Sequence, residues 1–257
     1  MLNNPPVGLL ALFQIVYAGS LILFSTSARA DVSEIKCEYF CSVDISGELQ
    51  QSDVRQLAVV ISKNNTTNPP TFPSQAKNLR VSLNSQGGDV AAAMKMGRLL
   101  RANEAWAFVR PNDVCASACV LILAGATMRT VLGYVVVHRP FWTFIGERPT
   151  SQVQKERDDL RNEMRKYLEE VNVSPLLLEL MDSIPPEKAR VLTAEELELF
   201  KLSTDDPVYQ EKLDAYWAKK LGISRQELVR RKAQCSSISD LETHSRCISN
   251  LYFPKSQ

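Results

Sequence analysis

Two side chains and one backbone turn in this sequence have the chemistry needed for acyl transfer. Ser117 lies in the segment Cys-Ala-Ser-Ala-Cys, and His138 ends the apolar run Gly-Tyr-Val-Val-Val-His. A serine hydroxyl becomes a nucleophile when a histidine takes its proton. Gly87 and Gly88 follow a short β-prone run, and glycines let the backbone present its N–H groups to an oxyanion. Together these residues predict a serine-hydrolase site.

Each of these features also has a plain structural explanation. A serine at the beginning of a helix commonly caps it. A histidine at the end of a buried strand is often a core residue, and a lone Gly-Gly is often a tight turn. The hydrolase prediction therefore depends on whether the fold brings the three features together.

The surrounding pattern predicts the elements that would position them. Residues 79–83, 106–110 and 133–138 are typical of strands. A helix is expected from about Asp89. The uncharged stretch 115–126 is a buried helix or a buried strand, and its alanines and length favour a helix with Ser117 at its start. Strands that alternate with helices indicate an α/β protein with a mainly parallel sheet, in which sites lie at the carboxyl ends of the strands.

The flanking segments extend this plan. Residues 39–49 alternate as a strand does, Ser52 could cap the helix that follows, and 64–73 is a loop by composition. From Thr150 onward the sequence predicts amphipathic helices. We therefore expect one α/β domain over 31–203 and a helical C-terminal extension over 204–257, helical to Arg231 and irregular beyond.

The N-terminus predicts export. Residues 7–25 carry no charge, and Ala28 and Ala30 form the A-x-A pattern that a signal peptidase cleaves. Residues 1–30 are therefore expected to be a signal peptide, cleaved after Ala30, and the mature chain to be periplasmic. The alternative is an uncleaved membrane anchor, since the apolar run is long enough to span a bilayer.

The cysteines fit an exported chain. All six lie after the expected cleavage site and fall into three neighbouring pairs, Cys37 with Cys41, Cys115 with Cys119, and Cys235 with Cys247. An even count in an oxidising compartment favours disulfides. In an ideal helix, residues four apart have Cα atoms about 6 Å apart, which suits a Cys115–Cys119 bridge. Two buried free thiols, or a longer-range pairing with Cys37 or Cys41, remain as alternatives.

Charge and composition exclude several other classes. The net charge is +1, and removal of residues 1–30 leaves 29 basic and 29 acidic residues. A chain with such balanced charge lacks the excess of basic residues that is typical of nucleic-acid-binding proteins. Only two histidines are present and no C-x2-C pair occurs, so no metal site is expected.

In order and spacing, the candidate residues resemble the Clp-protease proteolytic subunit/crotonase superfamily. The first shared segment is Asn84-Ser85-Gln86-Gly87-Gly88-Asp89-Val90, with Arg101 near the end of the helix that follows. The second is Ala116-Ser117-Ala118-Cys119-Val120 through Ala124-Gly125, with Arg129 shortly after. The third is Val137-His138-Arg139-Pro140, and the last is Thr193-Ala194-Glu195-Glu196-Leu197. The resemblance covers about 40–203.

The resemblance implies a ββα superhelix with a mainly parallel sheet and a site without a cofactor. Ser117 would be the nucleophile and His138 the base, and the N–H groups of Gly87 or Gly88 and of Ala118 would hold the oxyanion. The family's third, acidic member aligns with Ala189 here, so this chain departs from the pattern. Asp182 or Glu187 could substitute, or the triad is incomplete.

The implied substrate is a peptide or protein. Relatives stack into rings, so a homo-oligomer is an expectation of the resemblance. No ATPase partner is implied, because ATP is absent outside the cytoplasm. Two alternatives remain: a non-catalytic binding or scaffold protein with the same fold, and a thioester enzyme of the crotonase type. The thioester enzyme is disfavoured, since coenzyme A thioesters are cytosolic.

Overall fold

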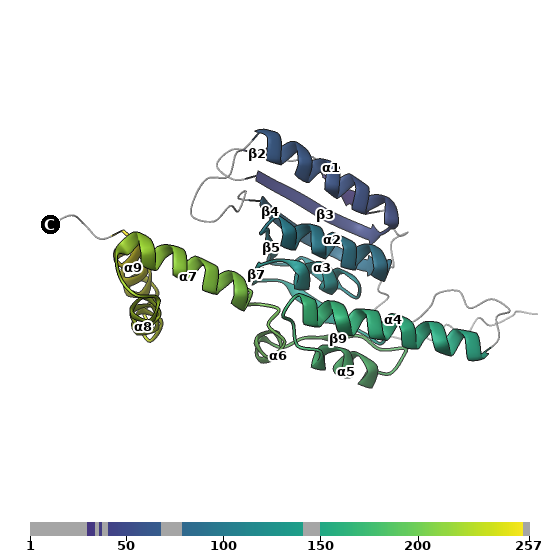
Figure 1. Ribbon diagram of the computed structural model, residues 1–257. Coiled ribbons are helices and arrows are strands. Elements are labelled where there is room, and N and C mark those ends of the chain that lie inside the picture. The colour runs from purple at the N-terminus through teal and green to yellow at the C-terminus, as the bar shows by residue number, and fades with distance from the viewer. Residues whose placement is uncertain (1–29, 34–35, 38–40, 68–78, 141–149, 254–257) are drawn as a thin grey trace, which may run out of the picture.

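The computed structural model describes residues 30–33, 36–37, 41–67, 79–140 and 150–253. They form an α/β fold in which strands and helices alternate up to residue 137 and helices dominate thereafter (Figure 1). Within these residues one nine-stranded sheet is built from β1 (Asp31–Val32), β2 (Lys36–Cys37), β3 (Cys41–Leu49), β4 (Leu79–Gly88), β5 (Trp106–Val109), β6 (Val114–Ala116), β7 (Met128–Val131), β8 (Tyr134–Val137) and β9 (Arg190–Val191).

The sheet branches at β4. This strand pairs with β3 on one side, and on the other its first half pairs with β5 while Ser85 pairs with Cys115 of β6. One branch continues from β5 to β7, and the other continues from β6 through β8 to β9. The pairings among β3 to β8 are parallel, whereas β1, β2 and β9 add antiparallel edges. The expected mainly parallel sheet is confirmed.

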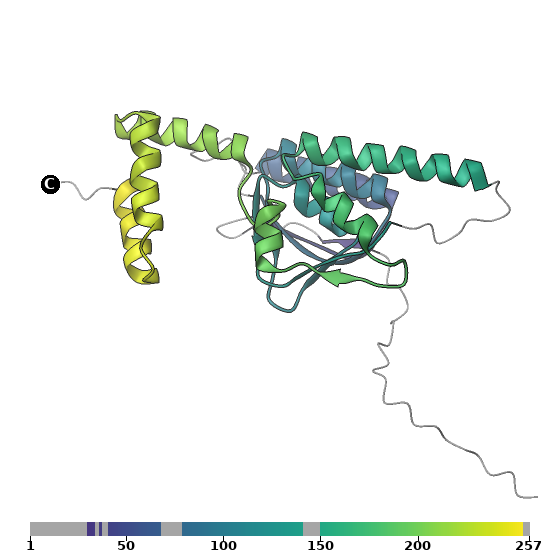
Figure 2. The same ribbon diagram turned by 90° about the horizontal axis from the view of Figure 1, so that it is seen from below.

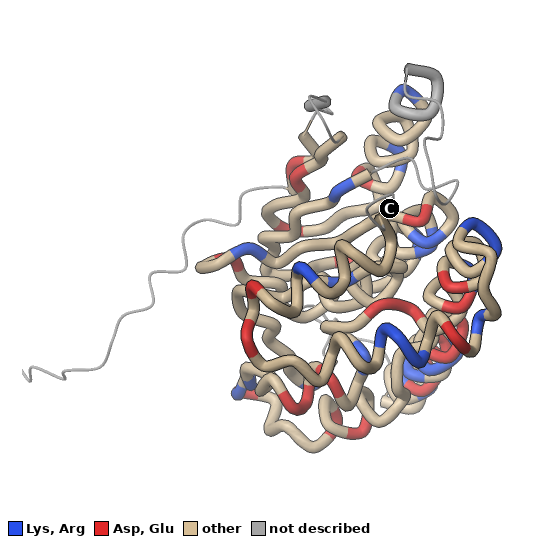
Figure 3. The backbone as a smooth tube through the Cα atoms, turned by 90° about the vertical axis from the view of Figure 1, so that its left-hand side faces the viewer, with Lys and Arg blue, Asp and Glu red and all other residues tan. Residues whose placement is uncertain are grey.

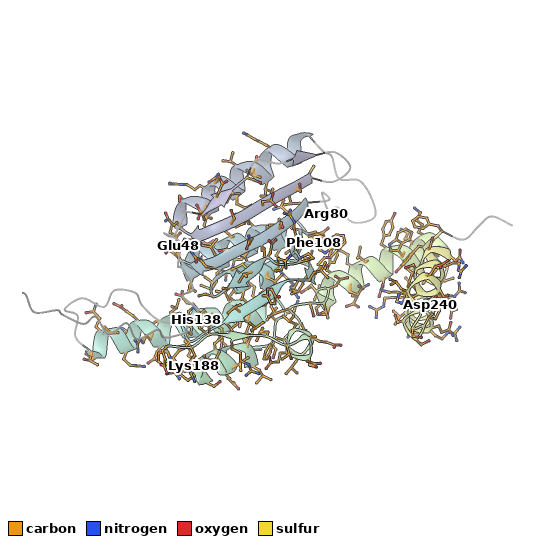
Figure 4. All side chains as sticks on the ribbon, turned by 180° about the vertical axis from the view of Figure 1, so that it is seen from behind. Glu48, Arg80, Phe108, His138, Lys188 and Asp240 are labelled. Atoms are coloured by element: carbon orange, nitrogen blue, oxygen red, sulfur yellow. A yellow bond between two sulfur atoms is a disulfide. The ribbon has the colours of Figure 1, made fainter. Side chains whose placement is uncertain are left out.

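Helices of the first half cover one face of the sheet (Figure 2). They are α1 (Gln51–Thr67), α2 (Val90–Ala102) and α3 (Cys119–Gly125). The core lies between these helices and the strands, and its fully buried residues include Val43, Leu83 and Ile122. Gly97 and Gly125 let α2 and α3 cross closely, because a Cβ on Gly125 would lie 2.4 Å from the Gly97 Cα. The opposite face of the sheet carries Arg80 and Phe108 (Figure 4).

The second half is helical apart from β9. It consists of α4 (Thr150–Glu170), α5 (Leu176–Ser183), α6 (Ala194–Leu199), α7 (Pro207–Leu221), α8 (Arg225–Ser236) and α9 (Leu241–Tyr252). Helices α7 to α9 form an arm that extends away from the sheet (Figure 1). Basic and acidic residues are interspersed along the helices (Figure 3). None of the helices in the described residues combines the length and apolarity needed to cross a bilayer.

Several expected boundaries were wrong. Residues 115–126 are not one helix: the first two, Cys115 and Ala116, belong to β6, and α3 begins only at Cys119. The strand expected over 79–83 continues to Gly88, because Glu48 and Leu49 of β3 pair with the glycine turn.

Other differences concern the helix ends and the tail. Helix α1 begins at Gln51 and continues to Thr67, so Ser52 lies inside it and the first part of the expected 64–73 loop is helical. The rest of that segment lies outside the described residues. The tail does not become irregular after Arg231, since α8 continues to Ser236 and α9 follows. A Cys235–Cys247 disulfide and contact between the rings of Trp217 and Tyr252 hold α9 in place. The predicted signal peptide, apart from Ala30, lies outside the described residues.

Candidate functional site

Ser117 occupies the turn between β6 and α3 in a left-handed conformation. Its φ is +55°, a value that residues other than glycine seldom adopt. The N-cap of α3 is Ala118, and no side chain caps that end, so Ser117 is not a capping serine. Its N–H donates to the carbonyl oxygen of Val136 in β8 at 2.9 Å. A serine held in this strained conformation by its neighbours is typical of an active site.

A disulfide brackets this turn. Cys115 in β6 and Cys119, the first residue of α3, are joined with an S–S distance of 2.02 Å and a Cα–Cα distance of 5.2 Å. Both are fully buried. The predicted pairing is confirmed, although the bridge links a strand to a helix and not two turns of one helix. Cys41 is disulfide-bonded as well, and the side chain of Cys37 lies outside the described residues.

The glycine turn packs directly on Ser117. Gly87 has a φ of +101° and Gly88 of +139°. A Cβ on Gly87 would lie 2.7 Å from the Cβ of Ser117 and 3.0 Å from the nitrogen of Ala118. Only glycine fits at position 87, because any side chain there would collide with the serine turn. The expected closeness of the Gly-Gly turn and Ser117 is therefore present.

Ser85 supports this turn, a role that the sequence pattern did not reveal. Its hydroxyl donates to the carbonyl oxygen of Gly47 at 2.5 Å and accepts from the N–H of Gly87 at 3.1 Å. The N–H of Gly87 is thus engaged, and the N–H of Asp89 donates to the carbonyl oxygen of Leu49. In the described part of the chain, the N–H of Ala118 has no hydrogen-bond acceptor.

His138 leaves the sheet beside Ser117. Strands β6 and β8 are parallel neighbours with Ala116 opposite Val136, so Ser117 and His138 follow the carboxyl ends of adjacent strands. The ring nitrogen Nδ1 of His138 lies 2.7 Å from the carbonyl oxygen of Arg139. Among the described residues, no hydrogen bond joins the Ser117 hydroxyl to the His138 ring. The fold therefore places Ser117 and His138 at the same edge of the sheet without a hydrogen bond between them in the described part of the chain.

Asp182, the expected third member, is engaged elsewhere. Its Oδ2 accepts a hydrogen bond from Nε of Arg161 at 2.6 Å. Its main-chain oxygen accepts a hydrogen bond from Nη2 of Arg139 at 2.5 Å. Glu187 is exposed in the segment before β9. Within the described residues neither carboxylate has a recorded contact with His138. The assignment of Asp182 as the orienting acid stays a prediction without such a contact.

Ala189 directly precedes β9, which pairs with the strand that leads to His138. Strands β8 and β9 are antiparallel, with Val136 opposite Val191 and Val137 opposite Arg190. Continuing this register by one residue sets Ala189 opposite His138, and side chains directly opposite each other share one face of a sheet. Figure 4 shows His138 close to the segment that contains Lys188.

Arg129 fixes the far end of α3. Its side chain is 3% exposed. Nη2 donates hydrogen bonds to the carbonyl oxygens of Ala124 and Val171. Nη1 donates hydrogen bonds to the carbonyl oxygens of Lys201 and Thr204. Burial lowers the pKa of Arg129 to about 10, so the side chain is still a cation at neutral pH. Arg129 is therefore a structural anchor of α3, the helix that follows the Ser117 turn.

The described residues contain no group of three His, Cys, Asp or Glu side chains placed to hold a metal ion. Comparison of the chain with protein-family models and with curated proteins found no match.

Proposed function

We propose that this chain is an exported serine hydrolase of the Clp-protease/crotonase type, acting on peptides or proteins. The observation that carries the proposal is the left-handed Ser117 on the β6–α3 turn, packed against Gly87 and bracketed by the Cys115–Cys119 disulfide. Neither a capping role nor a turn preference explains this conformation, because serine neither caps α3 nor favours positive φ.

In the proposed reaction, the Ser117 hydroxyl attacks the carbonyl carbon of the substrate and its proton passes to Nε2 of His138. The oxyanion is held by the N–H groups of Ala118 and Gly88, because the Gly87 N–H is already bound by Ser85. His138 then gives its proton to the leaving amine or alcohol, which leaves an acyl group on Ser117. Water, activated by His138, releases the acid and restores the enzyme.

Disulfides support the exported location. They persist in oxidising compartments and are rare in the cytosol, and two intact bridges are present together with a third bonded cysteine, Cys41. We propose the cell exterior or periplasm as the site of action.

The experiment is a hydrolysis assay with a short activated ester and an unfolded polypeptide as substrates. We expect wild-type protein to hydrolyse the ester, and Ser117→Ala and His138→Ala to lose that activity. His244→Ala is the matched control, because His244 lies in α9 of the arm and should leave the rate unchanged. Equal rates in all four proteins would contradict the proposal.

The second candidate is a non-catalytic scaffold with the same fold. It is favoured by two observations: alanine stands at position 189, with which the family's acid aligns, and within the described residues no hydrogen bond joins Ser117 to His138. This candidate predicts that Ser117→Ala binds a polypeptide as wild type does while neither protein cleaves it.

A further inference from the structure

The two disulfides whose cysteines are both described lie in different surroundings. Cys115 and Cys119 are fully buried between β6 and α3. Cys235 of α8 is buried as well, but its partner Cys247 in α9 is only half-buried. A disulfide is reduced when a thiolate attacks one of its sulfur atoms, so the rate depends on access to that sulfur. The Cys235–Cys247 bridge therefore offers a reductant access through Cys247, whereas the Cys115–Cys119 bridge does not.

Helix α9 has little packing of its own. It is twelve residues long, and none of its side chains is buried. Isolated helices of this length are marginal in water, and most helices in proteins are stable because an apolar face is packed. The Cys235–Cys247 bridge joins the last turn of α8 to the middle of α9, across a sequence separation of 12. The bridge thus limits how far α9 can move from α8.

The other contact of α9 with the arm lies at its C-terminal end. The ring centroid of Tyr252 lies 4.7 Å from that of Trp217 in α7, and the ring centroid of Phe253 lies 5.8 Å from it. Tyr252 is half-buried and Phe253 is 65% exposed. Contact between partly exposed rings is a weak attachment compared with a covalent bond. The position of α9 therefore depends chiefly on the disulfide.

We propose that the Cys235–Cys247 bridge is a redox-sensitive connection: a dithiol reductant opens it in the folded protein and releases α9, while the Cys115–Cys119 bridge stays closed. A thiolate of the dithiol attacks Sγ of Cys247, the bond to Cys235 breaks, and Cys235 leaves as a thiolate that takes up a proton. The second thiol of the reagent then displaces Cys247, which also takes up a proton, and the reagent ends as a disulfide. The inference does not depend on whether Ser117 is reactive.

The change is confined to the end of the arm. Helices α8 and α9 lie far from the sheet (Figure 1), and α7 is joined to the core at Asp206, which accepts hydrogen bonds from Arg101 and Asn172. No residue of α9 takes part in these bonds. Release of α9 exposes apolar surface that the bridged arm partly covers, including the half-buried Ile248 and Leu251.

Differential alkylation tests the selectivity. The folded protein is incubated with dithiothreitol, free thiols are alkylated, and peptide mapping by mass spectrometry locates them. We expect alkylated Cys235 and Cys247 while Cys115 and Cys119 are still joined. In concentrated urea, where the protein is unfolded, both pairs should be alkylated. Reduction of Cys115–Cys119 as early as Cys235–Cys247 in the folded protein, or a Cys235–Cys247 bridge that resists until unfolding, would overturn the inference.

Hydrogen exchange with mass spectrometry tests the release of α9. After selective reduction, we expect the backbone amides of α9 to lose their protection and those of α2 in the core to keep it. The double variant Cys235→Ser/Cys247→Ser should show the same local loss without any reductant. Ser249→Ala is the matched control, because it changes an exposed residue of α9 and keeps the bridge; its α9 should stay protected.

Two outcomes of the exchange experiment would overturn the inference. One is an α9 that stays protected after reduction and in the double serine variant, which would show that packing alone holds the helix. The other is a loss of protection in α2 as well, which would show that the bridge supports the whole fold and not the end of the arm.

Discussion

The strain at Ser117 and the support around it decide what this residue can do. The glycines of the 87–88 turn both adopt positive φ, which glycine does without steric cost. The left-handed Ser117 was not predictable, because serine has no preference for that region. The conformation arises from tertiary contacts, namely the Val136 carbonyl oxygen that binds its N–H and the Gly87 backbone that packs on it. Sequence reasoning therefore singled out Ser117 as a candidate but did not predict its geometry.

The strain predicts a stability difference between two substitutions of the same residue. Ser117→Gly relieves the left-handed penalty, whereas Ser117→Ala retains a Cβ. We expect Ser117→Gly to be more stable than Ser117→Ala by about 1 kcal/mol in urea unfolding. Equal unfolding free energies would show that the turn stores no strain at this position.

The position opposite His138 in the strand register predicts a gain of function. Ala189→Asp would place a carboxylate opposite His138, where it could bind Nδ1 and stabilise the imidazolium. We expect this variant to react with a fluorophosphonate severalfold faster than wild type. Ala189→Asn, which is the same size but neutral, is the control and should show no acceleration. A slower Ala189→Asp protein would mean that the register does not continue to this residue pair.

Among the elements, the least predictable was the apolar stretch 115–126. Its alanines and lack of charge indicated one buried helix, yet Cys115 pairs with Ser85 and Val135 in the sheet. Short apolar runs cannot be divided into strand and helix by periodicity alone. The boundary is set by long-range pairing, which leaves Ser117 between the two elements. By contrast, β5 and the beginning of α2 were placed correctly, because their apolar periodicity matches a single type of element.

The Cys115–Cys119 bridge should matter more for reactivity than for stability. It closes a loop of only five residues, so its contribution to the unfolding free energy should be about 2 kcal/mol. Replacing both cysteines by alanine frees the backbone around Ser117, and we expect labelling by a fluorophosphonate to slow by roughly tenfold or more.

The matched control for that change is replacement of Cys235 and Cys247 by alanine. This bridge lies in the arm and joins α8 to α9, so its loss should leave the labelling rate unchanged. Equal slowing in both double variants would contradict a local role for the Cys115–Cys119 bridge.

Over the whole molecule, the arm is joined to the α/β core by a buried carboxylate. Asp206 is 1% exposed, and its carboxylate caps α7 by accepting a hydrogen bond from the N–H of Tyr209. The same carboxylate accepts hydrogen bonds from Arg101 at 2.9 Å and from Asn172 at 2.8 Å. The helical character of the arm was expected from sequence, but this junction was not. Arg101 and Asp206 are far apart in the chain, and no local pattern marks them as partners.

This junction predicts a pH dependence. Burial alone raises the pKa of Asp206, but the hydrogen bonds from Asn172, the Tyr209 N–H and Arg101 outweigh it and hold the pKa below its ordinary value. The ionised Asp206 carboxylate therefore stabilises the folded protein fully above its unfolded-state pKa of about 4. That stabilisation is lost as the pH falls through the lower pKa that Asp206 has in the folded protein. We expect Asp206→Asn to lower the unfolding free energy by about 3 kcal/mol at pH 7, with a smaller difference from wild type at pH 3.

Urea unfolding at both pH values checks this expectation. Glu170→Gln, which removes the exposed partner of Arg98, is the control and should cost less than about 1 kcal/mol. A difference between wild type and Asp206→Asn that is the same at both pH values would show that the Asp206 charge contributes nothing.

Covalent labelling followed by peptide mapping tests the central claim, that Ser117 is a histidine-activated nucleophile, most directly. The protein is incubated with a fluorophosphonate, and the modified residue is identified by mass spectrometry. We expect one adduct, on Ser117, in wild type and in His244→Ala. Ser117→Ala should carry none, and His138→Ala should react on the order of 10⁴–10⁶ times more slowly. An adduct on another residue, or equal labelling of wild type and His138→Ala, would contradict the account.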